Sequence, residues 1–214
     1  MGKLALGCVA ILVVLAVIVG ISFAGTYNRL VTLGQDVDRS WSEVENQYQR
    51  RADLVPNLVQ TVQGAANFEK ETLTAVTEAR ASVGRATVTP GKAPTDAESL
   101  ARYQAAQDQL GSALQRLLVV SERYPELKAN QNFRDLQAQL EGTENRITVA
   151  RNRYIDAVRA YNVTIRSFPS NLTAMIFKYK DKPNFAVENE ATISKPPTVD
   201  FGTSPAPASS PPAN

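Results

Sequence analysis

Residues 133–168 read FRDLQAQLEGTENRITVARNRYIDAVRAYNVTIRSF, and this stretch decides the predicted fold. Its apolar residues recur at alternating spacings of three and four, which places all of them on one stripe of a long helix. The stripe comprises Phe133, Leu136, Leu140, Ile147, Tyr154, Val158, Tyr161, Ile165 and Phe168. A helix with such a stripe buries it against partner helices. The same count places two charged residues, Glu144 and Arg151, in line with the apolar ones.

The composition allows one membrane segment and one domain of ordinary size in 214 residues, of which 43% are hydrophobic. The 23 basic and 21 acidic residues are spread along the chain, so no nucleic-acid footprint is visible. The chain has no histidine, which removes the usual general base, the usual triad and most transition-metal sites. The only cysteine, Cys8, lies in the first apolar run. We therefore expect no metal, no cofactor and no nucleic-acid partner.

The apolar run is LALGCVAILVVLAVIVGISFA, residues 4–24, and it carries no charge. At 1.5 Å per residue it is long enough to span a hydrocarbon core of about 30 Å. A cleavable signal sequence is the alternative, but its apolar core usually has about 7 to 15 residues. We therefore interpret residues 1–25 as a transmembrane anchor in contact with the lipid bilayer.

The side of the membrane on which the body lies is less constrained by the sequence. Lys3 precedes the run, while Arg29 and Arg39 follow it with acidic residues nearby, so the positive-inside rule barely discriminates. A short anchor before a long domain is typical of a signal anchor. We expect a single-pass protein of the bacterial inner membrane with a periplasmic body, and a cytoplasmic body is the alternative.

Residues 26–190 are predicted to form an antiparallel bundle of about four long helices, giving an all-α fold. The first stripe comprises Leu30, Leu33, Val37, Trp41, Val44 and Tyr48, and its helix can continue the anchor without a break. Pro56 is expected to end or kink that helix because proline lacks the amide hydrogen. The stripe then resumes through Leu58, Val62, Ala66, Leu73, Val76 and Val83, with Glu69 and Arg80 in line.

A loop is predicted at residues 84–95, GRATVTPGKAPT, where glycine and proline occur among small polar residues. The next helix has the stripe Leu100, Tyr103, Leu110, Leu114 and Leu117, and Pro125 closes it. After Pro169 the chain is short, partly apolar and aperiodic, which we interpret as a strap over the bundle. Residues 191–214 are rich in proline, serine and alanine and are predicted to be a disordered tail.

Five charged residues fall on the apolar stripes, where unpaired burial would cost several kcal/mol per ion. They are Arg51, Glu69, Arg80, Glu144 and Arg151. We interpret them as a polar core whose ion pairs fix the helix register. A ligand-binding or catalytic cleft, and placement at the edge of a stripe, are the alternatives.

Glu69 and Glu144 are the only two of these that could share acid–base work, and neighbouring arginines would lower their pKa values. No catalytic residue is assigned. Tyr124, Pro125 and Glu126 form a helix stop and restart, and the alternative is an exposed corner for docking a partner.

Several motifs together resemble the LemA family of bacterial membrane proteins. They are QRRADLVPNL (49–58), EARA (78–81), ERYPELKA (122–129), ENRI (144–147) with Arg151 and Tyr154, and AYN (160–162) leading to Phe168-Pro169. The resemblance covers Tyr27 to about Asn189 and implies a short N-terminal anchor with an antiparallel helical bundle. Some relatives resemble lipoproteins, which favours an external body. The chain departs from the family at Ile155, where asparagine is common, and in its tail.

The function expected from these observations is non-catalytic. The chain is interpreted as a membrane-anchored bundle that acts in protein interaction, scaffolding or assembly with an unidentified protein partner. One alternative is a hydrolase or peptidase-associated enzyme with a carboxylate or Lys/Ser site. Another is a homo-oligomer that organises membrane.

Overall fold

The computed structural model describes residues 2–64, 69–86 and 89–185. Within these ranges the chain forms helices and no strand. The helices are α1 (Gly2–Gln63), α2 (Lys70–Arg85), α3 (Ala97–Ser121), α4 (Pro125–Ala129), α5 (Gln131–Arg166) and α6 (Ser170–Ile176). The all-α prediction is therefore confirmed, with two short helices, α4 and α6, added to the four longer ones.

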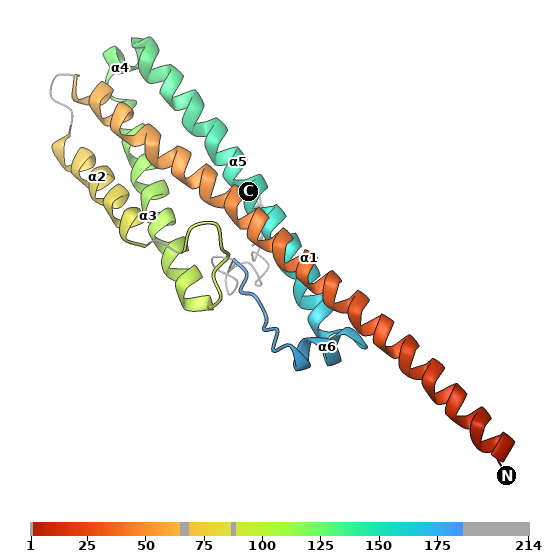
Figure 1. The fold of residues 1–214 in the computed structure, drawn as a ribbon. Coiled ribbons are helices and arrows are strands. Elements are labelled where there is room, and N and C mark those ends of the chain that lie inside the picture. Colours follow the sequence, from red (N-terminus) through yellow and green to blue (C-terminus); the bar gives the residue numbers. More distant parts are fainter. Residues whose placement is uncertain (1, 65–68, 87–88, 186–214) are drawn as a thin grey trace, which may run out of the picture.

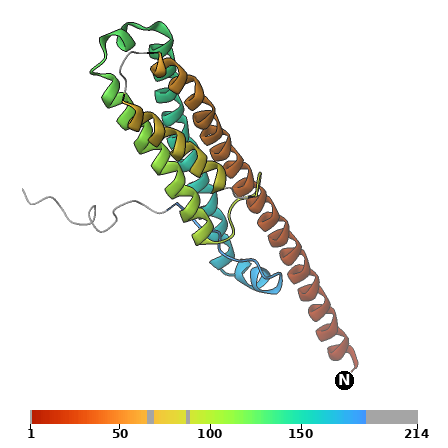
Figure 2. The ribbon, with the colours of Figure 1, turned by 90° about the vertical axis from the view of Figure 1, so that its left-hand side faces the viewer.

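The bundle consists of two helix pairs that lie side by side. The first pair is α1 with α5, and the second is α2 with α3, which lies along the C-terminal half of α1 (Figure 1). Turning the molecule shows α4 at the far end of the bundle and α6 at the end from which the N-terminal part of α1 projects (Figure 2). The two ends of the bundle are thus distinct in structure.

The anchor and the first bundle helix are one uninterrupted helix of 62 residues. Its N-terminal part projects beyond the bundle (Figure 1). Apolar side chains such as those of Ile11 and Val17 are exposed along this part. This is the one helix in the described part of the chain that is long and apolar enough to cross a membrane. The apolar segment therefore leads directly into the bundle core, with no loop between them.

The expected helix end at Pro56 is wrong, because α1 continues through this residue. Proline offers no amide hydrogen, so the carbonyl of Ala52, four residues earlier, loses its normal helix donor. The Nε of Arg80 on α2 donates a hydrogen bond to this carbonyl at 3.1 Å. A side chain from the neighbouring helix thus supplies the donor that proline removes.

Two apolar clusters fill the bundle. The cluster nearer the membrane anchor surrounds Trp41, whose ring centroid lies 5.3 Å from those of Tyr103 and Tyr154 and 6.1 Å from that of Phe185. The far cluster contains leucines of α3 and side chains of α1, α2, α4 and α5. It comprises Val55, Leu58, Val62, Val76, Ala79, Leu110, Leu114, Leu117, Leu127, Phe133 and Leu140.

Most of the predicted stripe on α5 is buried, but Phe168 is 80% exposed. The expectation for this residue is wrong because α5 ends at Arg166, so the helical count no longer places Phe168 on the stripe. The start of α5 is defined by Asn130, whose side-chain oxygen accepts hydrogen bonds from the amides of Asn132 and Phe133. Such caps satisfy amides that lack a partner inside the helix.

The predicted strap is confirmed for residues 177–185. The Tyr154 hydroxyl donates to the Pro183 carbonyl at 3.0 Å, and Asn162 makes two hydrogen bonds of 2.9 Å with the backbone of Lys182. The Phe185 side chain completes the cluster around Trp41. The predicted disordered tail, residues 191–214, and the last residues of the predicted bundle domain lie outside the described residues.

Candidate functional site

A buried arginine links the two helix pairs. Arg51 of α1 is 4% exposed, and its Nη1 lies 3.0 Å from Oε1 of Glu144 on α5. Its Nη2 donates to both the backbone and side-chain oxygens of Gln107 on α3, each at 2.7 Å. The guanidinium also lies over the Tyr48 ring, 5.1 Å from its centroid. One side chain therefore connects α1, α3 and α5.

The chemistry of the guanidinium accounts for this arrangement. A buried charge is tolerated only where hydrogen bonds replace lost hydration, and the planar arginine group offers several donors in fixed directions. The Glu144 side chain is 46% exposed, so water also solvates this carboxylate. Gln107 is almost fully buried, so its side-chain oxygen depends on the Arg51 donor more than Glu144 does. The backbone oxygen of Gln107 lies within α3, where it also accepts the helix amide four residues later.

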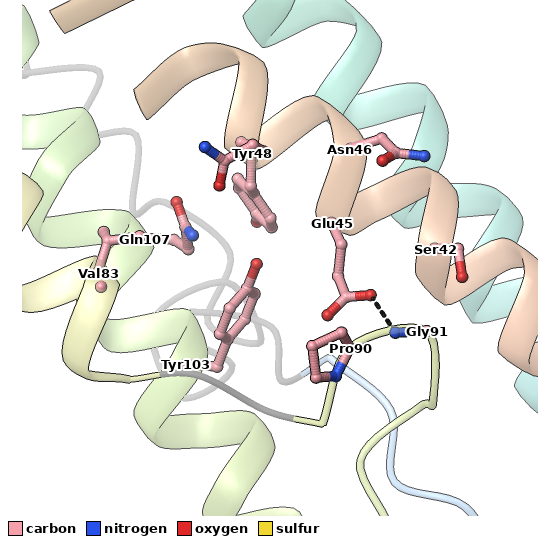
Figure 3. Close-up of a pocket in the computed structure, with 11 residues that line it drawn as sticks. Ser42, Glu45, Asn46, Tyr48, Val83, Pro90, Gly91, Tyr103 and Gln107 are labelled. Carbon is pink, nitrogen blue, oxygen red and sulfur yellow. Dashed lines mark hydrogen bonds between the residues drawn. The ribbon is translucent and has the colours of Figure 1, made fainter. Parts of the chain in front are cut away.

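A cleft of about 440 Å³ opens beside this arginine, between α1, the end of α2, the following loop and α3. Its wall includes Glu45, Tyr48, Tyr103 and Gln107, and Pro90 and Gly91 border it from the loop (Figure 3). The Gly91 amide donates to the Glu45 carboxylate at 3.0 Å. Gly91 has φ +72, a conformation that favours glycine, so this residue type suits the turn.

Tyr48 and Tyr103 give the cleft its chemical character. Their rings pack edge to face with centroids 5.7 Å apart, and the Tyr103 hydroxyl points toward Tyr48 (Figure 3). Burial raises the pKa of both phenols above the ordinary value of 10.0, although Arg151 and Arg51 lower that of Tyr48. Both groups are therefore protonated hydrogen-bond donors at neutral pH.

The cleft is equipped for binding by hydrogen bonds and apolar contact. Its volume falls in the range of small-molecule or side-chain pockets. Its carboxylate, Glu45, already accepts a backbone amide, and the chain has no histidine to act as base. Across the described ranges, no group of three His, Cys, Asp or Glu side chains is placed to hold a metal ion.

The structure separates the two carboxylates considered for shared acid–base work. Glu144 is paired with Arg51, whereas Glu69 lies at the N-terminus of α2 and is paired with Arg123 at 2.7 Å. The Glu69 side chain is partly exposed, and the Arg80 side chain is exposed apart from its bond to α1. Of the five predicted polar core residues, the structure therefore brings only Arg51 and Glu144 into one ion pair.

Arg151 is half-buried, and its guanidinium lies over the ring of Phe185, 4.5 Å from the centroid. The strap thus packs against this arginine.

At the predicted corner, Pro125 begins α4 in the first helical position, which suits a residue without an amide hydrogen. Tyr124 packs against the far cluster, while Pro125 and Glu126 are exposed.

Sequence reasoning missed Gln107 and Phe185. Gln107 lies four residues after Tyr103 and three before Leu110, so the same spacing of three and four would have included it in the stripe of α3. A search limited to apolar and charged residues passes over an amide. Phe185 lies in an aperiodic segment, and no local pattern indicates that it reaches the core.

Comparison with known proteins gives a consistent result. A model of the LemA family matches residues 40–201. Magnetosome protein MamQ 2 of Paramagnetospirillum magneticum is 28% identical over 197 residues, covering 83% of this chain and 72% of that protein. Magnetosome protein MamQ of Magnetospirillum gryphiswaldense is 26% identical over 193 residues, covering 81% of this chain and 71% of that protein.

Proposed function

The chain belongs to the LemA family, and from this premise we propose that it is a single-pass inner-membrane protein whose bundle binds a protein partner without catalysis. The observation that carries the proposal is the continuity of α1, which runs from the apolar segment into the bundle core. Because no flexible loop separates the two parts of α1, the direction of the membrane segment also sets the direction of the bundle. The bundle is therefore held in a defined position relative to the membrane.

The position of the cleft supports this function. Tyr48 lies 24 residues beyond Ala24, the last residue of the apolar run, which corresponds to about 36 Å along α1. A side chain or loop of a partner at that height could enter between the helix pairs and meet the phenol groups. The exposed face of Asn46 borders the same opening.

The names of the relatives support a structural role. They assign those proteins to the magnetosome and name no reaction. For this chain the corresponding role is to hold a partner in an assembly at the membrane. We propose that the body lies on the periplasmic side. Protease added to intact spheroplasts tests this orientation, because a periplasmic body is digested and a cytoplasmic one is protected.

Site-specific photocrosslinking in intact membranes tests partner binding. A benzoylphenylalanine in place of Asn46 lies at the cleft, and the same group in place of Asn152, an exposed asparagine of α5, is the matched control. Products are identified by mass spectrometry. A recurrent foreign protein linked through position 46 and not through position 152 is the expected result.

Two other outcomes would overturn the proposal. Products that contain only copies of this chain would replace the adaptor with a self-assembling protein. An absence of any product at position 46, with the protein present in the membrane at its normal level, would remove the cleft as a partner site.

A further inference from the structure

Large apolar side chains are exposed together at the end of the bundle nearest the anchor. They are Phe168, Leu172, Met175, Ile176 and Phe177, and we refer to them as the α6 patch. Elsewhere on the bundle, among the described residues beyond Val31, the large exposed hydrophobic side chains are the separate valines 119, 149 and 163. Scattered apolar residues are ordinary on a soluble surface, whereas a contiguous group indicates a contact site.

The height of the α6 patch relative to the membrane can be worked out from α1. The Phe177 ring packs against Tyr27 of α1, with centroids 4.7 Å apart. Tyr27 lies three residues beyond Ala24, the end of the apolar run, so it is about 4.5 Å further along the helix axis. The headgroup layer on each side of a bilayer is about 5 to 8 Å thick. The patch therefore lies at the level of the headgroups.

Basic residues adjoin the patch. Lys178 and Lys180 are exposed directly after Phe177, and Arg29 is exposed two residues beyond Tyr27. The nearby acid Asp181 is already paired with Arg166 at 2.7 Å. Among the described residues these lysines form no ion pair. Apolar side chains next to such lysines suit an interface with anionic phospholipid, because the rings enter the acyl boundary while the ammonium groups meet phosphates. Tyrosine is also common at this level.

We propose that α6 and the following turn form a second membrane contact, with the α6 patch inserted in the leaflet from which α1 emerges. The lysines at 178 and 180 contact anionic headgroups. α6 packs on both α1 and α5, so this contact opposes tilting of the bundle about the span. The views of the fold show α6 beside α1 where α1 leaves the bundle (Figures 1 and 2). The inference rests on the membrane-spanning α1 of the proposed function and is independent of any partner.

The test measures the depth of a fluorescent label in the full chain reconstituted into vesicles. Cys8→Ala removes the only cysteine, and Met175→Cys then carries an environment-sensitive nitrobenzoxadiazole label. Val119→Cys is the matched control, since Val119 is 70% exposed and Met175 is 74% exposed. Vesicles contain phosphatidylcholine and phosphatidylglycerol, with nitroxide groups placed on the lipid at the headgroup or along the acyl chain.

The expected result is strong quenching of the position 175 label by nitroxide near the headgroup, at least threefold above that of the position 119 label, with blue-shifted emission. Equal quenching of the two labels would overturn the inference. A blue shift at position 175 without nitroxide quenching, and dependent on protein density in the vesicle, would assign the patch to a second copy of the chain instead.

The contribution of charge is tested separately. Lys178→Gln with Lys180→Gln should reduce quenching in vesicles with phosphatidylglycerol toward the value in pure phosphatidylcholine. Identical quenching in the two lipids before substitution would overturn the headgroup contact. Flotation with the vesicles shows whether the N-terminal part of α1 is inserted in the membrane. Protein that floats but has a water-exposed label at position 175 would refute this inference and leave the proposed membrane-spanning α1 intact.

Discussion

The continuity of α1 through Pro56 makes a quantitative prediction about Arg80. The Nε–H of Arg80 supplies the donor that the Ala52 carbonyl lacks, at 3.1 Å. Arg80→Met retains much of the side-chain stem and removes the donor. A bond from a charged donor is worth about 1.5 to 3 kcal/mol, and partial exposure lets water replace part of it. We expect a loss of about 1 to 2 kcal/mol in the free energy of unfolding.

Pro56→Ala should reduce the contribution of Arg80 to the free energy of unfolding. Alanine restores the amide that bonds to Ala52 within the helix, and an interior proline costs about 3 kcal/mol relative to alanine. Pro56→Ala should therefore stabilise the protein. In that background the carbonyl is already satisfied, so Arg80→Met should cost less than about 0.5 kcal/mol. The two substitutions are coupled by about 1 kcal/mol.

The assay is thermal unfolding of the full chain in detergent, followed by circular dichroism at about 222 nm, where α-helices give a strong negative signal. In a chain of this size 1 kcal/mol corresponds to about 2 to 4 °C, so Arg80→Met should lower the Tm by about 2 to 8 °C. In the Pro56→Ala background the shift should be below about 2 °C. The control is Arg50→Met on the exposed face of α1. Equal shifts for Arg80→Met in both backgrounds would refute the role of the hydrogen bond.

Three further predictions concern other contacts. Arg51→Met should lower the free energy of unfolding by about 2 to 4 kcal/mol, because the buried side-chain oxygen of Gln107 loses its charged donor and Glu144 loses its ion-pair partner. Arg50→Met should have little effect in the same melt. Phe185→Ala should lower the free energy of unfolding by about 3 kcal/mol. It should also red-shift the fluorescence of Trp41, the only tryptophan, and unchanged emission would contradict packing of the strap on Trp41. A hydrogen bond from a backbone amide holds the pKa of Asp96 below its ordinary 3.8, so its stabilisation is present above that pH and is lost as the pH falls through the lower, folded value. Asp96→Asn should therefore make acid unfolding below about pH 4 less steep, and an unchanged acid profile would argue against this cap.

The sequence predicted the helices well because their signal is local. The spacing of apolar residues defines which face of each helix is buried, and α1, α3 and α5 follow these faces closely. The predicted helix end at Pro56 was wrong because a residue distant in sequence changes the outcome of the local rule. Pro56 is an interior residue of α1 because a side chain of α2 supplies the donor that proline removes.

The candidate site could be predicted only in part from the spacing of residues. Arg51 and Glu144 stood out as charges on apolar stripes, and they meet although 93 residues separate them. Their partner Gln107 lies 56 residues from Arg51, and nothing in the sequence pairs those two positions. A stripe specifies the face of a helix, but it does not specify the axial offset between two helices, which decides the contacts.

The sequence by itself determined a long apolar span, a set of amphipathic helices and the charged residues that burial requires to be paired, because each follows from periodicity or composition within one segment. Only the tertiary structure decided that Arg51 links the two helix pairs, that a cleft opens beside Tyr48, and that the α6 patch lies next to Tyr27. These features depend on the axial offset between each helix and its neighbour. That distance is set by the packing of the whole bundle.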